Sequence, residues 1–306
     1  MKDTYESPLN SRYASDRMKY IFSPDFKFRT WRRLWIALAE SEKELGLNIT
    51  DEQIAELKAH KDDINYDVAA AREKEVRHDV MSHVYAYGVQ CPNAKPIIHL
   101  GATSCYVGDN TDVIIMREAM LLIRKELVNL LNVLAKFAVE YKDMPCLAFT
   151  HFQPAQPTTV GKRAALWLNE FLMDFQNLEF QLSQLKLLGS KGTTGTQASF
   201  MELFDNDTDK VKALDKMIAE KMGFDSCFAV SGQTYSRKLD YQMLTVLCGI
   251  AMSATKFSND IRLLQHMKEI EEPFEKHQIG SSAMAYKRNP MRSERIASLS
   301  RYIIAD

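Results

Sequence analysis

Hydrophobic residues recur at helical spacing along three long stretches of the chain, residues 112–142, 158–188 and 236–270. A helix of such a stretch would extend roughly 45 Å at about 1.5 Å per residue. A helix with one wide apolar stripe must bury that stripe against partner helices. Strand-like alternation of apolar and polar residues does not compete with this pattern. The sequence therefore predicts an all-α fold, built as a long helical bundle.

Shorter helical patterns lie before and between these stretches. Residues 25–46 carry apolar side chains at helical spacing and end at Gly46, where a C-terminal cap belongs. Thr50-Asp51-Glu52-Gln53 is a capping box that opens a short helix. Further helices are predicted over residues 66–87 and about 208–222.

The N-terminal segment, residues 1–24, contains two prolines and is expected to be irregular. The change from short to long helical patterns predicts a domain boundary. We place an N-terminal helical domain at residues 1–111 and a central long-helix bundle domain at residues 112–306.

Loops rich in glycine, hydroxyl and amide side chains connect the predicted helices. They span His99–Asp112, Thr150–Pro157, Gly189–Gln197 and Gly232–Arg237. In the first loop, the residues from Asp109 to Asp112 favour the N-cap position of the following helix. Functional groups of long bundles often lie in such loops, because rigid elements hold them in place.

Composition excludes several classes of function. Hydrophobic residues make up 46% of the chain, charged residues 26%, and the net charge is −1, so no nucleic-acid footprint is present. The N-terminal residues lack the apolar core of a signal peptide. No run approaches the ~18 apolar residues that a membrane span needs. We expect a cytoplasmic protein with neither a nucleic-acid nor a membrane partner.

The five cysteines are scattered and never occur in CxxC spacing: Cys91, Cys105, Cys146, Cys227 and Cys248. A disulfide framework and a zinc site are both disfavoured by this arrangement. Asp79 and His83 stand four residues apart on one predicted helix face, which makes a metal pair conceivable. A third ligand at a recognisable spacing is missing, and a histidine on a helix is more often a structural residue. We predict no metal site.

The stretch Gly280–Arg295 has the composition of a mobile active-site loop. Two serines follow Gly280, and four cations lie within nine residues: Lys287, Arg288, Arg292 and Arg295. Asn289-Pro290 is typical of a turn and a helix start. A helix N-terminus beside serines and cations favours anion binding, because free N–H groups and the helix dipole point at the ligand. On composition alone, a solvated basic loop is an equally good interpretation.

The order of these residues resembles a known signature. Gly-Ser-Ser-Ala-Met-Ala-Tyr-Lys-Arg-Asn-Pro, from Gly280 to Pro290, is similar to the signature of the fumarase/aspartase lyase superfamily. The continuation Met-Arg-Ser-Glu-Arg resembles the adenylosuccinate lyase family within it. One position departs from the family pattern, since Ala285 stands where the family usually has proline, which loosens the loop. The resemblance runs from about Tyr5 to the last residue.

The resemblance implies a function. Family members eliminate fumarate from adenylosuccinate, giving AMP, and from SAICAR, giving AICAR, in purine nucleotide biosynthesis. The reaction is a general acid–base β-elimination of a small-molecule substrate and needs no cofactor. The family is homotetrameric, and loops of several subunits assemble each active site.

The resemblance also implies catalytic roles. It makes Ser281 the general base, and backbone N–H groups, Lys287 and Asn289 stabilise the charge that develops on the substrate carboxylate. His151, in Thr-His-Phe-Gln-Pro-Ala, matches the family's catalytic histidine and becomes the acid. From the residues alone, any histidine could titrate near neutral pH. Without the resemblance, the sequence does not rank His151 above His78 or His99.

The remaining residues that the resemblance carries over bind the phosphate, ribose or succinyl carboxylates. Arg77-His78-Asp79 matches the family's substrate-contacting RHD motif, and Thr103-Ser104 lies in its phosphate- and carboxylate-binding turn. The implied substrate-binding residues are Arg12, Tyr13, Arg77, His78, Asp79, Thr103, Ser104, Gln233, Asn289 and Arg295. Guanidinium groups suit such anions because they donate two parallel hydrogen bonds.

Family members run well past Asp306, so we expect a truncated chain with an incomplete central bundle and no C-terminal helical domain. Two alternatives to the implied function stay open. The chain could be a non-catalytic subunit that associates with the full-length enzyme and modulates it. It could also be another fumarate-releasing lyase, such as argininosuccinate lyase or fumarase, although the run from Tyr286 to Arg295 argues against these.

Overall fold

The computed structural model describes residues 3–306 and divides the chain into two compact units. The first unit comprises the residues up to Leu122 together with Gln184–Arg237. The second comprises Ile123–Ser183 together with Lys238–Asp306. The domain boundary after residue 111 stays a prediction.

The first unit is built from helices and their connecting loops. Its elements are η1 (Leu9–Tyr13, a π-helical turn), α1 (Asp16–Ile21), α2 (Pro24–Glu44), α3 (Asp51–Ala59), α4 (Tyr66–Val76), α5 (Asp79–Gln90), η2 (Lys95–Ile97), the first part of α6 (Ser104–Glu140), α8 (Ala198–Leu203) and α9 (Thr208–Lys221). The expectation of an irregular N-terminus is therefore wrong for η1 and α1. Ser15 caps α1, because its hydroxyl accepts the N–H of Met18 at 3.2 Å.

The predicted caps of the next helices are confirmed. Gly46 follows α2 with a φ of 102°, the left-handed conformation that glycine adopts without strain. Thr50 and Gln53 form the capping box of α3. Helix α2 supplies the large core side chains of this unit, with Trp31 and Trp35 each 1% exposed.

The single helix predicted over residues 66–87 is wrong, because α4 and α5 are separate helices. Arg77 has a φ of 55°, which ends α4. His78 then caps α5, since its Nδ1 accepts the N–H of Met81 at 3.3 Å. The break between the two helices is therefore made by Arg77 and the His78 cap. No glycine or proline marks this break in the sequence.

Helix α6 begins at Ser104, earlier than the predicted start at residue 112. Asp109, Asn110 and Thr111 are buried within it and do not cap it. Asn110 instead donates to the Gly189 carbonyl at 3.1 Å and accepts the Gly189 N–H at 2.9 Å. Tertiary partners satisfy the side chains of Asp109 and Asn110 inside the helix, which propensity alone does not reveal.

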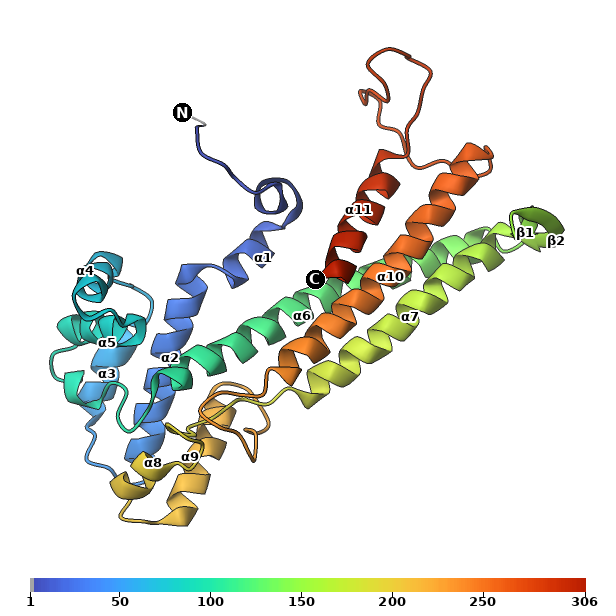
Figure 1. Ribbon diagram of the computed structural model, residues 1–306. Helices are drawn as coiled ribbons and strands as arrows, with labels where there is room; N and C mark the ends of the chain where they lie inside the picture. The colour runs from blue at the N-terminus through green and yellow to red at the C-terminus, as the bar shows by residue number, and fades with distance from the viewer. Residues whose placement is uncertain (1–2) are drawn as a thin grey trace. The chain divides into compact units, whose positions relative to one another are not determined.

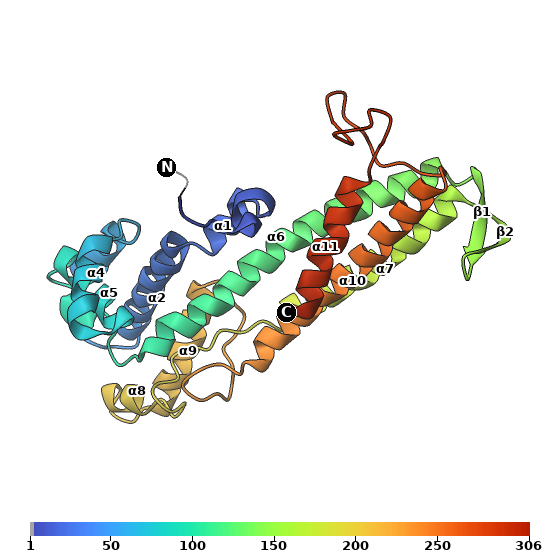
Figure 2. The ribbon, with the colours of Figure 1, turned by 45° about the horizontal axis from the view of Figure 1, so that its top comes forward.

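Long helices form the second unit. The later part of α6 lies alongside α7 (Val160–Gln184), α10 (Lys238–His266) and α11 (Met291–Ala305) (Figures 1 and 2). Ala164 and Trp167 of α7 pack with Ile261 and Leu264 of α10 in its core. Phe137, Ala138, Phe257 and Ile270 pack against this cluster. The predicted long helical bundle is confirmed.

The predicted loop at residues 150–157 is wrong in part, because most of it belongs to a β-hairpin. Strand β1 (Pro145–Thr150) pairs antiparallel with β2 (Gln153–Thr159) at the end of the bundle (Figure 1). The prolines of β2 conceal the strand in the sequence. They are tolerated because each strand of a two-stranded sheet has an unpaired edge.

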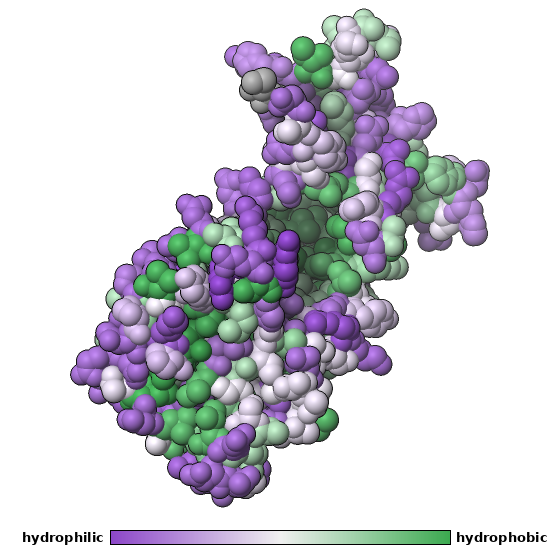
Figure 3. Space-filling view, turned by 60° about the vertical axis from the view of Figure 1, so that its left-hand side comes forward, coloured by the Kyte–Doolittle hydropathy of each residue, from purple (hydrophilic) through white to green (hydrophobic). Residues whose placement is uncertain are grey.

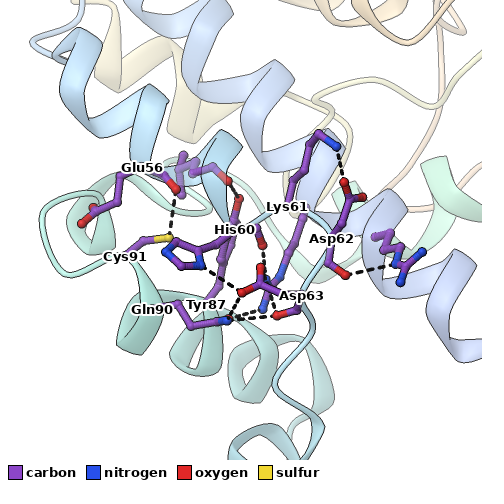
Figure 4. A network of polar contacts seen from close by, with 11 residues as sticks. Glu56, His60, Lys61, Asp62, Asp63, Tyr87, Gln90 and Cys91 are labelled. Atoms are coloured by element: carbon purple, nitrogen blue, oxygen red, sulfur yellow. Dashed lines mark hydrogen bonds and ion pairs between the residues drawn. The ribbon is translucent and has the colours of Figure 1, made fainter.

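A polar network fixes α5 to α2 and to the turn between α3 and α4. Arg32 of α2 is 2% exposed, and its guanidinium donates to the Asp63 carbonyl at 3.2 Å and to Gln90 Oε1 at 2.6 Å. Gln90 also donates to the Asp63 carbonyl at 2.9 Å, and Figure 4 shows the Gln90 side chain pointing towards Asp63. The ring of Tyr87 lies 4.2 Å from the guanidinium. The network holds α5, whose N-terminus carries His78.

The surface is mixed in polarity. The space-filling view shows apolar patches interspersed with hydrophilic side chains (Figure 3). Across residues 3–306, none of the helices combines the length and the apolar character that crossing a membrane requires.

Candidate active site

Two of the sequence-predicted binding segments meet in the first unit. Ser104 Oγ, at the start of α6, lies 3.3 Å from Nε2 of His78 at the start of α5. Because Nδ1 of His78 accepts the Met81 N–H, the neutral ring carries its proton on Nε2 and donates it to Ser104. The hydroxyl proton of Ser104 is then available to a ligand.

The neighbours of His78 are exposed. Arg77 is the residue with positive φ between the two helices, and its side chain is exposed. Asp79 Oδ1 accepts the Val80 N–H at 2.7 Å and lies 3.8 Å from Nδ1 of His78. A cation, an imidazole and a carboxylate therefore follow one another on consecutive residues at a helix start, next to Ser104.

His83 and His99 are structural in character. His83 stacks on Phe28 with the ring centroids 3.7 Å apart, and burial lowers its pKa to about 4, helped by the nearby cation Arg32. His99 accepts the indole N–H of Trp35 at 2.9 Å, and burial likewise lowers its pKa to about 4. Both rings are neutral near neutral pH and poorly suited to donate a proton. In the described part of the chain, no group of three or more histidine, cysteine or acidic side chains could hold a metal ion.

The turn that leads to Thr103 and Ser104 rests on α8. Gly101 has a φ of 65°, and a Cβ at this position would lie 2.5 Å from Leu203 Cδ1. The carbonyl of Gly101 accepts the hydroxyl of Ser199 at 2.6 Å. Glycine avoids both the strain of the positive φ and this close contact, so it suits the turn that precedes α6.

Asp109 anchors the segment that carries Gln233. Its carboxylate accepts the N–H of Tyr235 at 3.0 Å and lies 3.2 Å from the Arg237 guanidinium. The expectation that Asp109 caps a helix is therefore wrong, because no local pattern in the sequence indicates this long-range contact. Gln233 itself is exposed, as are Arg12 and Tyr13 in η1.

In the second unit, His151 lies at the tip of the β1–β2 hairpin. His151 and Phe152 form its two-residue turn, with φ values of 52° and 61°. The His151 ring is exposed and lines a pocket of about 510 Å³ beneath the hairpin. Lys162 and Arg163 of α7 also line this pocket. Within residues 3–306, the His151 side chain has no hydrogen-bond partner.

Ser281 and Lys287 lie in the long loop between α10 and α11 (Figures 1 and 2). Ser281 Oγ accepts the N–H groups of Ala283 and Met284 at 3.3 and 3.2 Å. Lys287 is exposed, and its ammonium forms no ion pair with the residues that the structure describes. Asn289 donates to the Gly280 carbonyl at 2.7 Å, so part of its amide closes the loop.

The anion at the start of α11 belongs to the chain itself. Glu272 accepts the N–H groups of Arg292 and Ser293 at 3.0 and 3.1 Å. The predicted anion-binding character of this N-terminus is real, but the expected external ligand is replaced by a side chain. Arg295 is exposed further along α11.

The predicted site residues thus form two groups. The first unit holds Arg12, Tyr13, Arg77, His78, Asp79, Thr103, Ser104 and Gln233, and the second holds His151, Ser281, Lys287, Asn289 and Arg295. Among the described residues, a hydrogen bond joins His78 to Ser104, whereas none joins His151 to Ser281 or Lys287. The roles assigned to these residues stay predictions.

Comparisons with known proteins identify the family of the chain. The family model described as "Lyase" matches residues 23–305. The chain is 56% identical over 304 residues to the adenylosuccinate lyase of Saccharomyces cerevisiae and 54% identical over 304 residues to that of Schizosaccharomyces pombe, covering 98% of this chain and 63% of each relative. It therefore spans less than two thirds of their length. Its fold is similar to that of 3-carboxy-cis,cis-muconate lactonizing enzyme from Pseudomonas putida, with a TM-score of 0.82 and 24% identity over 97% of this chain and 65% of that chain.

Proposed function

Because the chain belongs to this lyase family, we propose that it is the corresponding part of an adenylosuccinate lyase of purine nucleotide biosynthesis. Its reaction would release fumarate from adenylosuccinate, leaving AMP, and from SAICAR, leaving AICAR. The observation that carries the proposal is the identity of 56% to an adenylosuccinate lyase along 98% of the chain.

Elimination of fumarate removes a proton from the carbon beside a carboxylate and gives a proton to the departing nitrogen. We assign the first step to Ser281. Its Oγ accepts the N–H groups of Ala283 and Met284, and these fixed donors stabilise an alkoxide more than a neutral hydroxyl. Lys287, exposed in the same loop, stabilises the charge that develops on the substrate carboxylate.

We assign proton donation to His151. Its ring lines a pocket together with Lys162 and Arg163, and these cations attract a succinyl group with two carboxylates. Arg163 is already paired with Glu269 at 2.9 Å, so Lys162 is the better candidate to meet the substrate. His83 and His99 are excluded from this role by their burial and lowered pKa values.

Substrate binding falls to polar side chains of the first unit. The Arg77 guanidinium is exposed and forms no ion pair with the described residues, so it suits a phosphate or a carboxylate. Ser104 is oriented by His78 and offers its hydroxyl proton. Thr103, Asp79, Gln233, Arg12 and Tyr13 complete the proposed set, and Asn289 and Arg295 of the second unit join it.

We also propose that the chain acts in the cytoplasm and assembles as a homotetramer. Free cysteines are compatible with a reducing compartment. Exposed apolar side chains on the long helices support association with other helices.

The decisive experiment measures fumarate release from adenylosuccinate and SAICAR, with argininosuccinate as the competing substrate. His151→Ala and Ser281→Ala are each expected to lower kcat by about 10² to 10⁴-fold. Ser282→Ala is the matched control, because it removes the neighbouring exposed hydroxyl. Turnover of argininosuccinate alone would overturn the proposal.

The same assay tests the alternative of a non-catalytic subunit. In that case the purified chain shows no turnover, co-purifies with a full-length adenylosuccinate lyase and changes its rate. Full activity of both alanine variants would contradict the assigned roles but leave the reaction itself intact.

A further inference from the structure

Gln265 links the two sides of the loop between α10 and α11. Gln265, near the end of α10, is 6% exposed. Its Nε2 donates to the carbonyl of Arg288 at 3.0 Å, and its Oε1 accepts the N–H of Glu272 at 3.2 Å. The amide group therefore uses both its N–H and its oxygen. The oxygen binds the part of the loop that leaves α10, and the N–H binds the part that returns to α11.

Glu272 continues this contact to α11. Its carboxylate accepts the N–H groups of Arg292 and Ser293 at 3.0 and 3.1 Å and the Ser293 hydroxyl at 3.0 Å. Pro290 occupies the N-cap position of α11 and makes no side-chain cap, so Glu272 supplies one from the loop. Hydrogen bonds from a helix N-terminus to a carboxylate are charge-assisted and therefore stronger than neutral ones.

A second constriction lies further along the loop, and we call it the neck (Gly280, Lys287 and Asn289). Asn289 donates to the Gly280 carbonyl at 2.7 Å. A Cβ on Gly280 would lie 2.1 Å from the Lys287 carbonyl oxygen, so the outgoing and returning parts of the loop touch here. The segment from Ser281 to Lys287 is closed on itself and should reorient as one body.

The other acids of the loop make weaker contacts. Glu271 lies 3.6 Å from Arg288, and Glu275 pairs with Arg292, both as exposed ion pairs. Exposed pairs contribute little. Glu272 differs from them because its partner Ser293 is 4% exposed and two of its three hydrogen bonds come from the backbone.

We propose that Gln265 and Glu272 form a base clamp and are positioning residues, which set the orientation of the closed segment from Ser281 to Lys287. The base clamp acts through the loop and does not touch the reacting atoms. Its existence is independent of the chemistry, whereas its effect on turnover rests on the proposed function.

Amide hydrogen exchange on the 306-residue chain tests the base clamp directly. In Glu272→Ala, the amides of Arg292 and Ser293 are expected to exchange about tenfold faster or more, because each loses a bond to a charged acceptor. The amides of Ala283 and Met284 lie in the segment that the neck closes and should keep their exchange rates. Glu275→Gln, which removes a charge from the same segment, should leave all of these rates unchanged.

Conservative variants separate positioning from folding. Glu272→Asp keeps the carboxylate and should restore most of the protection. Ser293→Ala removes the hydroxyl contact alone and should give a smaller increase, so it replaces Glu272→Ala if that variant fails to fold. Unchanged exchange at Arg292 and Ser293 in a folded Glu272→Ala protein would refute the clamp.

Turnover provides the second measurement, in whichever form of the enzyme releases fumarate. A misplaced loop lowers kcat, by about 100-fold for a shift of roughly 1 Å. KM should change less than kcat, since most of the proposed binding residues lie in the first unit and are untouched. Glu272→Asp should recover kcat, and equal kcat for Glu272→Ala and wild type would refute the positioning role. Absence of activity in the wild type would instead count against the proposed function, and the exchange result would still decide the clamp.

Discussion

Glu42 is a buried acidic residue of the first unit. It lies on α2 with an exposed fraction of 0%, and neither carboxylate oxygen finds a hydrogen-bond partner among the described residues. Burial raises its pKa to about 9. The side chain is therefore a neutral acid at physiological pH, held in the core without compensation.

This raised pKa predicts a stability that falls with pH. Between the ordinary pKa of 4.5 and the folded value of about 9, the folded protein keeps a proton that the unfolded chain has released. Stability is thus greatest below the lower value and declines towards the upper one, by about 1.4 kcal/mol per pH unit. Urea unfolding at about pH 6 and about pH 8 should differ by roughly 3 kcal/mol from this group.

Glu42→Gln is the comparison for this measurement, because it keeps the shape and cannot titrate. Its free energy of unfolding should change much less between the two pH values than that of the wild type. Equal changes in both proteins would show that Glu42 does not hold its proton in the fold.

The histidines show what the sequence could not predict at this scale. Spacing left His78, His99 and His151 as equal candidates for the acid, and only the resemblance ranked them. Burial against Trp35 lowers the pKa of His99, and capping of α5 engages His78. These contacts link residues far apart in the sequence, so no local pattern contains them. His151 keeps an exposed ring.

Among the elements, the β1–β2 hairpin carries backbone strain beside the proposed acid. His151 and Phe152 both have positive φ, which costs a residue with a side chain about 1 to 2 kcal/mol. Phe152 is 71% exposed, so it gains little from burial. Strain of this kind is often found where a side chain must be presented to a ligand.

Phe152→Gly should therefore stabilise the chain by about 1 kcal/mol, because glycine adopts positive φ without strain. Thermal unfolding monitored by circular dichroism measures the change. Gln153→Gly is the matched control, since it weakens the start of β2 and should lower the melting temperature. A lower melting temperature for Phe152→Gly would mean that the exposed ring makes a contribution larger than the strain.

The elements differ in how far the sequence predicts them. The long helices and the caps at Gly46 and Thr50 follow from local pattern, and the structure contains them. The break at Arg77 was not predicted, because an arginine rather than glycine or proline ends α4, and a histidine caps the start of α5. The Glu272 cap was not predicted for a similar reason. A carboxylate that caps α11 from the preceding loop leaves no signal at the helix start itself.

At the scale of the whole molecule, the proposed binding and catalytic residues lie mostly in different units. The residues proposed to bind substrate lie mainly in the first, and those proposed to react lie in the second. The resemblance covers both units, whereas helical periodicity explains the bundle and little of the loops that hold the site. Loops owe their conformation to tertiary contacts such as Asp109 with Tyr235, which no sequence pattern displays.

The bundle exposes an apolar stripe that bears on assembly. Leu166, Met173 and Phe180 of α7 stand seven residues apart and are 50%, 62% and 59% exposed. A seven-residue apolar repeat is typical of a helix that packs against another helix. We expect the chain to self-associate, and light scattering coupled to size exclusion measures the mass. Changing all three residues to glutamine should shift it towards a monomer.

The control for this shift changes exposed polar residues away from α7, Lys212→Ala and Lys216→Ala of α9, and should leave the mass unaltered. Circular dichroism must show equal helix content in all variants, because loss of the fold would also abolish association. A monomeric wild type at micromolar concentration would contradict the proposed assembly for this chain. An unchanged oligomer in the glutamine variant would place the interface elsewhere, since three buried polar side chains without partners oppose helix packing.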